Sequence, residues 1–118
     1  MSPDRSADAG PLSTVAVEVL LALATGPKHG YAIKREIEDR IGDDFVLGSG
    51  SLYQALQRLE RRGLIAERRA AAPGDARRGR VYALEAEGRR VLAAELGRMQ
   101  RVLGHAKRRR LAIGPERT

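Results

Sequence analysis

The residues best suited to a chemical role lie along one polar face of residues 51–61. They stand opposite a stripe of leucines, and they are Gln54, Gln57, Arg58 and Arg61. Glutamine and arginine side chains hydrogen-bond the edges of bases and bind phosphates. Tyr53 is suited to extend its hydroxyl to a phosphate, or only to pack its ring against the core. The pattern predicts contact with a nucleic acid, and the alternative is an ordinary solvated helix face.

Further hydroxyl groups and cations flank this segment. Ser49 and Ser51 stand where it begins, so their hydroxyls can cap a helix, bind a phosphate, or do both. A second basic group surrounds Gly79 and consists of Arg77, Arg78 and Arg80. A flexible basic loop of this kind binds phosphates or the minor groove, although it can also serve only for solubility. Lys28 and Lys34 are further candidates for phosphate contact.

The charge distribution favours a polyanionic partner. The 118 residues carry a net charge of +7, from 22 Lys and Arg against 15 Asp and Glu. Residues 1–45 hold 5 basic and 8 acidic residues, whereas residues 46–118 hold 17 basic and 7 acidic ones. This asymmetry is the electrostatic footprint of a protein that binds a polyanion. A generally arginine-rich composition is the alternative explanation, because nearly all of the basic residues are arginines.

No group of residues predicts catalysis or metal binding. The chain has no cysteine, and its two histidines, His29 and His105, lie 76 positions apart. It contains no nucleophile–base pair and no glycine-rich phosphate loop, so an enzyme is the least supported class of function. We expect His29 to cap or hydrogen-bond the start of a helix, and we expect neither a cofactor nor a metal ion.

Three helices are predicted to position the polar face, at residues 12–24, 30–41 and 51–62. Apolar residues nearly surround the first helix, which predicts that it is buried, with Ser13 or Thr14 as its N-cap. Isoleucines four residues apart give the second helix one apolar face. Gly63 closes the third. Two helices separated by a break, followed by a helix with a polar face, are typical of a helix-turn-helix.

A β-hairpin and a long helix follow. Residues 64–69 and 80–84 are expected to be strands, because the second run alternates polar and apolar residues and a turn signal, Pro73-Gly74-Asp75, lies between the two. A hairpin after a helix-turn-helix is a wing. Residues 86–110 are predicted to form the last helix.

This last helix carries an apolar seam suited to pairing with a second copy of the chain. Its members recur at spacings of four and three residues and are Leu92, Leu96, Met99, Leu103 and Ala106. A heptad-like seam is typical of paired helices, although this one is only about three repeats long. Gly97 and Gly104 lie beside it, either to admit a partner helix or as weak points that cost about 1 kcal/mol each relative to alanine. Whether residues 12–24 also join the interface is left open.

From about residue 12 to residue 90 the chain resembles the PadR family of winged-helix regulators. The resemblance is carried by LLALATGPKHGYAIKREIEDRIG at 20–42, GSLYQALQRLERRGLI at 50–65 and RVYALEAEGRR at 80–90. It implies a dimer that binds a pseudo-palindromic operator, commonly as a repressor, and that often releases DNA when a small molecule binds near the dimer interface. The scarcity of aromatic residues argues against an aromatic-lined effector pocket, so an effector is left unproven.

The predicted fold class is mainly α with a small two-stranded β wing. Its parts are a disordered leader at 1–11, a winged helix-turn-helix DNA-binding domain at 12–85, a C-terminal dimerisation helix at 86–110 and a flexible tail at 111–118. We expect a homodimer on double-stranded DNA, without a membrane segment and in the cytoplasm. The alternative is a winged-helix protein-interaction module that does not bind DNA specifically.

Overall fold

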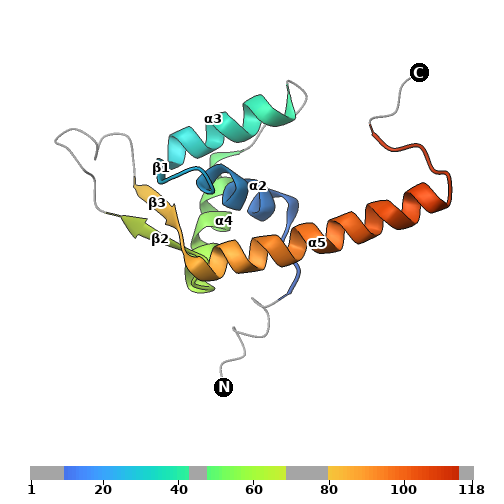
Figure 1. The fold of residues 1–118 in the computed structure, drawn as a ribbon. Coiled ribbons are helices and arrows are strands. Elements are labelled where there is room, and N and C mark those ends of the chain that lie inside the picture. The colour runs from blue at the N-terminus through green and yellow to red at the C-terminus, as the bar shows by residue number, and fades with distance from the viewer. Residues whose placement is uncertain (1–9, 43–47, 69–79, 115–118) are drawn as a thin grey trace.

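The computed structural model of the protein describes residues 10–42, 48–68 and 80–114. Its helices are α2 (Thr14–Leu23), α3 (Gly30–Ile41), α4 (Ser49–Arg61) and α5 (Ala86–Arg108), and its strands are β1 (Lys28–His29), β2 (Ile65–Arg68) and β3 (Val81–Leu84). Figure 1 shows the sheet at one side of the helices and α5 running across the molecule to the far side. The described residues thus form the expected winged helix-turn-helix followed by a long helix.

Helix α2 lies at the centre of the fold because apolar residues nearly surround its axis. Val19 and Leu20 are completely buried, and the helix contacts α3, α4, α5 and β3. Ser13 caps its first turn, since its Oγ accepts a hydrogen bond from the Ala16 N–H at 3.1 Å. The predicted burial and the predicted N-cap are therefore confirmed. The helix ends at Leu23, one residue earlier than expected.

Helix α3 follows its predicted bounds. Ile33 and Ile37 are completely buried, and Gly42 ends the helix with φ at +109°. His29 occupies the N-cap position, although its side chain makes no capping hydrogen bond. The expected position of His29 is confirmed and a side-chain cap is not formed, whereas its alternative role as a hydrogen-bond partner stays a prediction.

Helix α4 begins at Ser49, two residues before its predicted start, and ends at Arg61, one residue before its predicted end. Gly63 follows in the left-handed region, with φ at +76°. Its N–H donates to the Glu60 carbonyl at 2.9 Å, while the Leu64 N–H donates to the Leu59 carbonyl at 3.0 Å. This pair of bonds is a Schellman motif, for which glycine is the favoured residue. It turns the chain directly from α4 into β2.

The sheet has three antiparallel strands in the order β1-β3-β2. Strands β2 and β3 pair along their whole length, with Ile65 opposite Leu84 and Arg68 opposite Val81. Strand β1 pairs with the other edge of β3, where Lys28 lies opposite Tyr82. The predicted two-stranded hairpin is confirmed, and β1 adds a third strand that was not predicted. A strand of two residues has no alternation to predict it, and β1 exists because the link from α2 to α3 runs along β3.

The start of α5 packs closely on the turn that follows α4. The Glu85 N–H donates to the Leu64 carbonyl at 3.0 Å. One turn later Gly88 faces the same carbonyl, and a Cβ placed on Gly88 would lie only 2.1 Å from the Leu64 oxygen. No side chain fits in that space. Gly97 and Gly104, the two glycines predicted to matter in this helix, have no comparable contact within this chain.

Only the first half of α5 packs on the domain. Leu92 is buried, and Val91 and Met99 are partly buried against the core. From Gln100 to Arg108 every residue is exposed or intermediate, and this half extends past the other helices in Figure 1. The helix ends at Arg108, two residues before its predicted end. Most of the predicted leader (1–9), the hairpin loop (70–79) and the last four residues of the predicted tail (115–118) lie outside the described residues.

Candidate nucleic-acid interface

Helix α4 turns its predicted polar face to the solvent. Leu52, Leu56 and Leu59 point into the core and are almost completely buried. The residues on the other side are all exposed, and they are Ser51, Tyr53, Gln54, Gln57, Arg58 and Arg61. Tyr53 is 50% exposed, so much of its ring is accessible. The leucine spacing therefore predicted the exposed side correctly for Gln54, Gln57, Arg58 and Arg61.

The start of α4 differs from the expectation. Gly48 takes the N-cap position, so neither Ser49 nor Ser51 caps the helix. Ser51 lies inside the first turn and is exposed. The expected capping by these serines is corrected, whereas their contact with a phosphate stays a prediction.

Arg80 lies at the base of the wing beside a carboxylate and two tyrosines. Its Nη1 is 3.7 Å from Oε1 of Glu67 on β2, and both side chains are largely exposed. The pKa of Arg80 is raised, chiefly by the charge of Glu67 and then by Tyr53 and Tyr82, and Tyr82 also hydrogen-bonds it. Because Tyr53 belongs to α4 and Arg80 precedes β3, the charge of Arg80 lies within electrostatic reach of the exposed side of α4.

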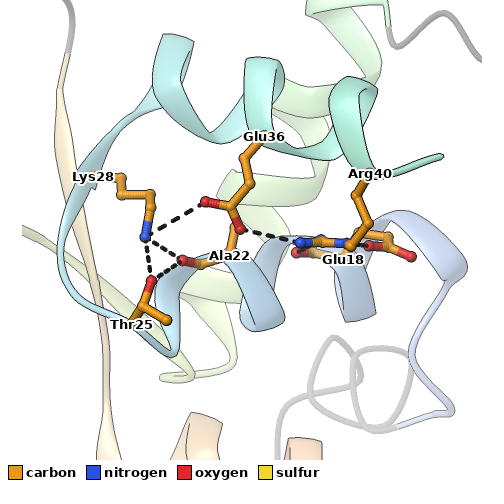
Figure 2. A network of polar contacts seen from close by, with 6 residues as sticks. All are labelled: Glu18, Ala22, Thr25, Lys28, Glu36 and Arg40. Atoms are coloured by element: carbon orange, nitrogen blue, oxygen red, sulfur yellow. Dashed lines mark hydrogen bonds and ion pairs between the residues drawn. The ribbon is translucent and has the colours of Figure 1, made fainter. Parts of the chain in front are cut away.

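Lys28 points into the protein rather than toward solvent, as Figure 2 shows. Its Nζ donates to the Ala22 carbonyl at 2.5 Å and to Thr25 Oγ1 at 2.7 Å, and it lies 3.7 Å from Oε1 of Glu36. Ala22 is in the last turn of α2, where the helix dipole is negative and a cation is stabilising. Lys28 thus joins α2, β1 and α3.

Glu36 extends this network to the other end of α3. Its second carboxylate oxygen accepts a hydrogen bond from Arg40 at 3.1 Å, and the Arg40 Nε donates to Glu18 of α2 at 2.8 Å. Lys34 lies 3.6 Å from Glu38, one turn along α3. The predicted phosphate contacts of Lys28 and Lys34 would therefore compete with contacts inside the protein.

Arg77 and Arg78, the other two predicted wing arginines, lie outside the described residues. Their contact with DNA stays a prediction.

Two exposed residues of α3 were missed by the sequence argument. Tyr31 is 61% exposed, and the guanidinium carbon of Arg35 lies 5.9 Å from the centre of its ring. The Arg35 Nη1 also donates to the Tyr31 hydroxyl oxygen at 3.3 Å. The signal was available, because these residues are four apart on the side of α3 opposite Ile33 and Ile37.

The predicted seam of α5 divides into a buried part and an exposed part. Leu92 is only 5% exposed and belongs to the chain's own core, and Met99 is partly buried against that core. Leu96 and Leu103 are 36% and 43% exposed. Ala106 is intermediate. Val102, which the seam did not include, is 54% exposed, so the accessible apolar surface is wider than predicted.

Within the described ranges, no group of three His, Cys, Asp or Glu side chains is placed to hold a metal ion. In the same part of the chain, no helix is long and apolar enough to cross a membrane.

The sequence matches known proteins over most of its length. The transcriptional regulator PadR-like family matches residues 19–94. An uncharacterized 37.1 kDa protein in transposon TN4556 of Streptomyces fradiae is 45% identical over 86 residues. Those residues make up 73% of this chain and 23% of the transposon protein, so the chain spans less than a quarter of that relative.

Solved structures share the fold. A PadR family transcription regulator from Clostridium difficile superposes with a TM-score of 0.68 at 22% identity, over 81% of this chain and 97% of that one. A transcriptional regulator from Clostridium thermocellum gives a TM-score of 0.69 at 22% identity, over 80% and 90% of the two chains. The complex structure of hsRosR-S4, from H. salinarum, gives 0.64 at 29% identity, over 81% and 77%. With the family match covering well over half of its residues, the chain belongs to the PadR-like family of transcriptional regulators.

Proposed function

We propose that this protein is a sequence-specific DNA-binding regulator that works as a homodimer and represses transcription from its operator. The observation that carries the proposal is the exposed polar face of α4, with Arg80 at the base of the wing within electrostatic reach of it. Membership of a family of transcriptional regulators supports it.

The face of α4 has the chemistry of base reading. Arginine donates two hydrogen bonds to guanine, and glutamine makes a two-point contact with adenine, both in the major groove. Gln54, Gln57 and Arg58 offer these groups from consecutive turns of one exposed helix side. Arg77, Arg78 and Arg80 of the wing supply phosphate and minor-groove contacts.

The second half of α5 supplies the dimer interface. Val102 and Leu103 are exposed apolar side chains in this half, and Leu96, which is also exposed, lies just before it. Pairing with the same segment of a second copy would bury them. A two-fold axis would then set the two α4 helices in successive major grooves, roughly 34 Å apart.

Release from the operator follows from any signal that changes the angle between the protomers, because the two α4 helices would then no longer match the groove spacing. The protein acts where the chromosome lies, in the cytoplasm.

A titration against DNA tests the proposal. An operator is first selected from a pool of randomised duplexes, and the protein is then titrated with that duplex and with a scrambled one at several salt concentrations. We expect the selected duplex to bind about 10³-fold more tightly or better, with a steep fall in affinity as salt rises. Equal affinity for both duplexes would refute sequence-specific regulation and favour the protein-interaction module.

Arg58→Ala examines the reading role of α4. We expect a loss of about 1–3 kcal/mol on the selected duplex and a relaxed preference at one base position. Arg90→Ala is the matched control, since it removes the same charge from α5, where Arg90 is paired with Glu87. Repression itself is measured with a reporter gene whose promoter overlaps the selected operator, with and without the protein.

A further inference from the structure

Tyr31 and Arg35 form a preorganised pair on the outer side of α3. The Arg35 guanidinium lies 5.9 Å from the centre of the Tyr31 ring, and its Nη1 donates to the Tyr31 hydroxyl oxygen at 3.3 Å. Each side chain thereby restricts the rotamers of the other. Both are exposed, so their remaining hydrogen-bonding groups face solvent.

The hydrogen bond between Arg35 and Tyr31 determines which of their N–H and O–H groups remain available to a ligand. Because Arg35 donates to the tyrosine oxygen, the Tyr31 O–H keeps its proton for another acceptor. A guanidinium has five N–H donors, and this contact uses one of them. The pair therefore offers a neutral O–H and several charged N–H groups side by side, which is the donor set that a phosphate diester accepts.

Tyr31 lies in the first turn of α3, next to the base of the wing. The Gly30 N–H donates to the Arg80 carbonyl at 3.1 Å, so Tyr31 follows a residue that is bonded to the wing. The Tyr82 ring also lies 3.9 Å from the Cβ position of Gly30. These contacts hold the first turn of α3 against Arg80 and Tyr82 at the base of the wing.

Two other cations of this region are paired with groups of the protein itself. Lys28 binds the end of α2 and Glu36, and Lys34 lies beside Glu38. The carboxylates that act on Arg35 are Asp39 and Glu38, both further along α3 and away from the wing. Arg35 is thus the cation of α3 that is exposed and directed by an aromatic partner.

We propose that Tyr31 and Arg35 are a phosphate clamp, which extends the DNA-contacting surface from α4 and Arg80 onto α3. The clamp rests on the proposed function for its ligand, the backbone of the duplex that α4 reads. It supplies affinity and fixes the position of the helix-turn-helix on the duplex, and it reads no bases.

Arg35→Ala and Tyr31→Phe test the clamp on the selected operator and on the scrambled duplex. Because a phosphate contact is independent of sequence, Arg35→Ala should weaken both complexes by about tenfold or more. The slope of log affinity against log salt should fall by about 2 for a dimer, one phosphate contact from each protomer. Tyr31→Phe should weaken both complexes by a smaller factor and leave the slope unchanged, because it removes a neutral donor.

Arg90→Ala, which removes the same charge from α5, should keep wild-type affinity and slope on both duplexes. Melting temperatures of all variants show that the fold is retained. Wild-type affinity in Arg35→Ala would overturn the clamp, and so would a loss confined to the selected operator, since that would indicate base reading. Failure of the wild type to distinguish the duplexes would refute the proposed function instead, and the scrambled duplex alone would still decide on the clamp.

Discussion

Among the described glycines, Gly88 is the one that least tolerates a side chain. Its Cα faces the Leu64 carbonyl, which also accepts the Glu85 N–H. The obstacle is a backbone carbonyl. The turn at Leu64 and the start of α5 cannot move apart without breaking the hydrogen bond from the Glu85 N–H to the Leu64 carbonyl. A single missing methyl group thus decides how closely the last helix approaches the turn after α4.

Gly88→Ala should lower the free energy of unfolding by about 1–3 kcal/mol, as overpacking of a filled site does. Urea denaturation followed by circular dichroism measures it. Gly50→Ala is the control, because nothing lies within 4 Å of a Cβ at that exposed helical position. It should leave stability unchanged or raise it by up to about 1 kcal/mol. Equal stability of the wild type and the Gly88 variant would show that α5 can shift to accept a side chain.

At the scale of elements, α2 and α3 are joined at both ends by charged groups. Lys28 binds the last turn of α2 and reaches Glu36, while Arg40 reaches back to Glu18 (Figure 2). The two helices also pack together through apolar side chains, because Ile33 and Ile37 of α3 belong to the same buried core as α2. The apolar contact supplies most of the stability, and the polar network fixes the orientation of α3.

Lys28→Met should destabilise the protein by about 1–2 kcal/mol, because it keeps the aliphatic stem and leaves the Ala22 carbonyl without its charged donor. Lys34→Met, which removes a half-exposed pair on a single helix, should cost at most about 0.5 kcal/mol. Thermal unfolding at equal protein concentration compares the two. Equal effects would mean that the inward contacts of Lys28 add nothing to stability.

The elements could be predicted where one short-range pattern determines them. Helix α3 was predicted with its bounds because the spacing of Ile33 and Ile37 and the break at Gly42 agree. The polar side of α4 followed from three leucines. Strand β1 could not be predicted, since its only reason to be extended is a partner some fifty residues later in the chain. Lys28 and Arg35 are likewise both cations in the sequence, and only the tertiary structure shows which one faces inward.

At the scale of the whole molecule, the chain places two kinds of surface far apart. In Figure 1 the strands of the wing lie at one side, and the second half of α5 extends to the other side; that half carries the exposed Val102 and Leu103. An exposed apolar helix segment of this kind marks an interaction site. In the proposed homodimer, the apolar surface of α5 pairs with its copy, and this pairing sets the distance between the two α4 helices.

Leu96→Asp should give a monomer, because pairing would bury its carboxylate against a second apolar helix. Ala94→Asp, at an exposed position on the opposite side of α5, should remain dimeric. Sedimentation equilibrium or light scattering measures the mass of both. A Leu96 variant that stays dimeric would refute the assignment of this face to the interface.

The junction at Leu64 has a mechanical consequence. Its N–H closes the Schellman turn of α4, its carbonyl holds the start of α5, and the next residue begins β2. These backbone hydrogen bonds hold the end of α4 and the start of α5 against each other, so we expect the two helices to move as one body. A rotation of the free half of α5 would then rotate α4 by nearly the same angle. In the proposed homodimer, a small rotation about the paired α5 helices would therefore displace the two α4 helices by a larger distance, because α4 lies farther from that axis.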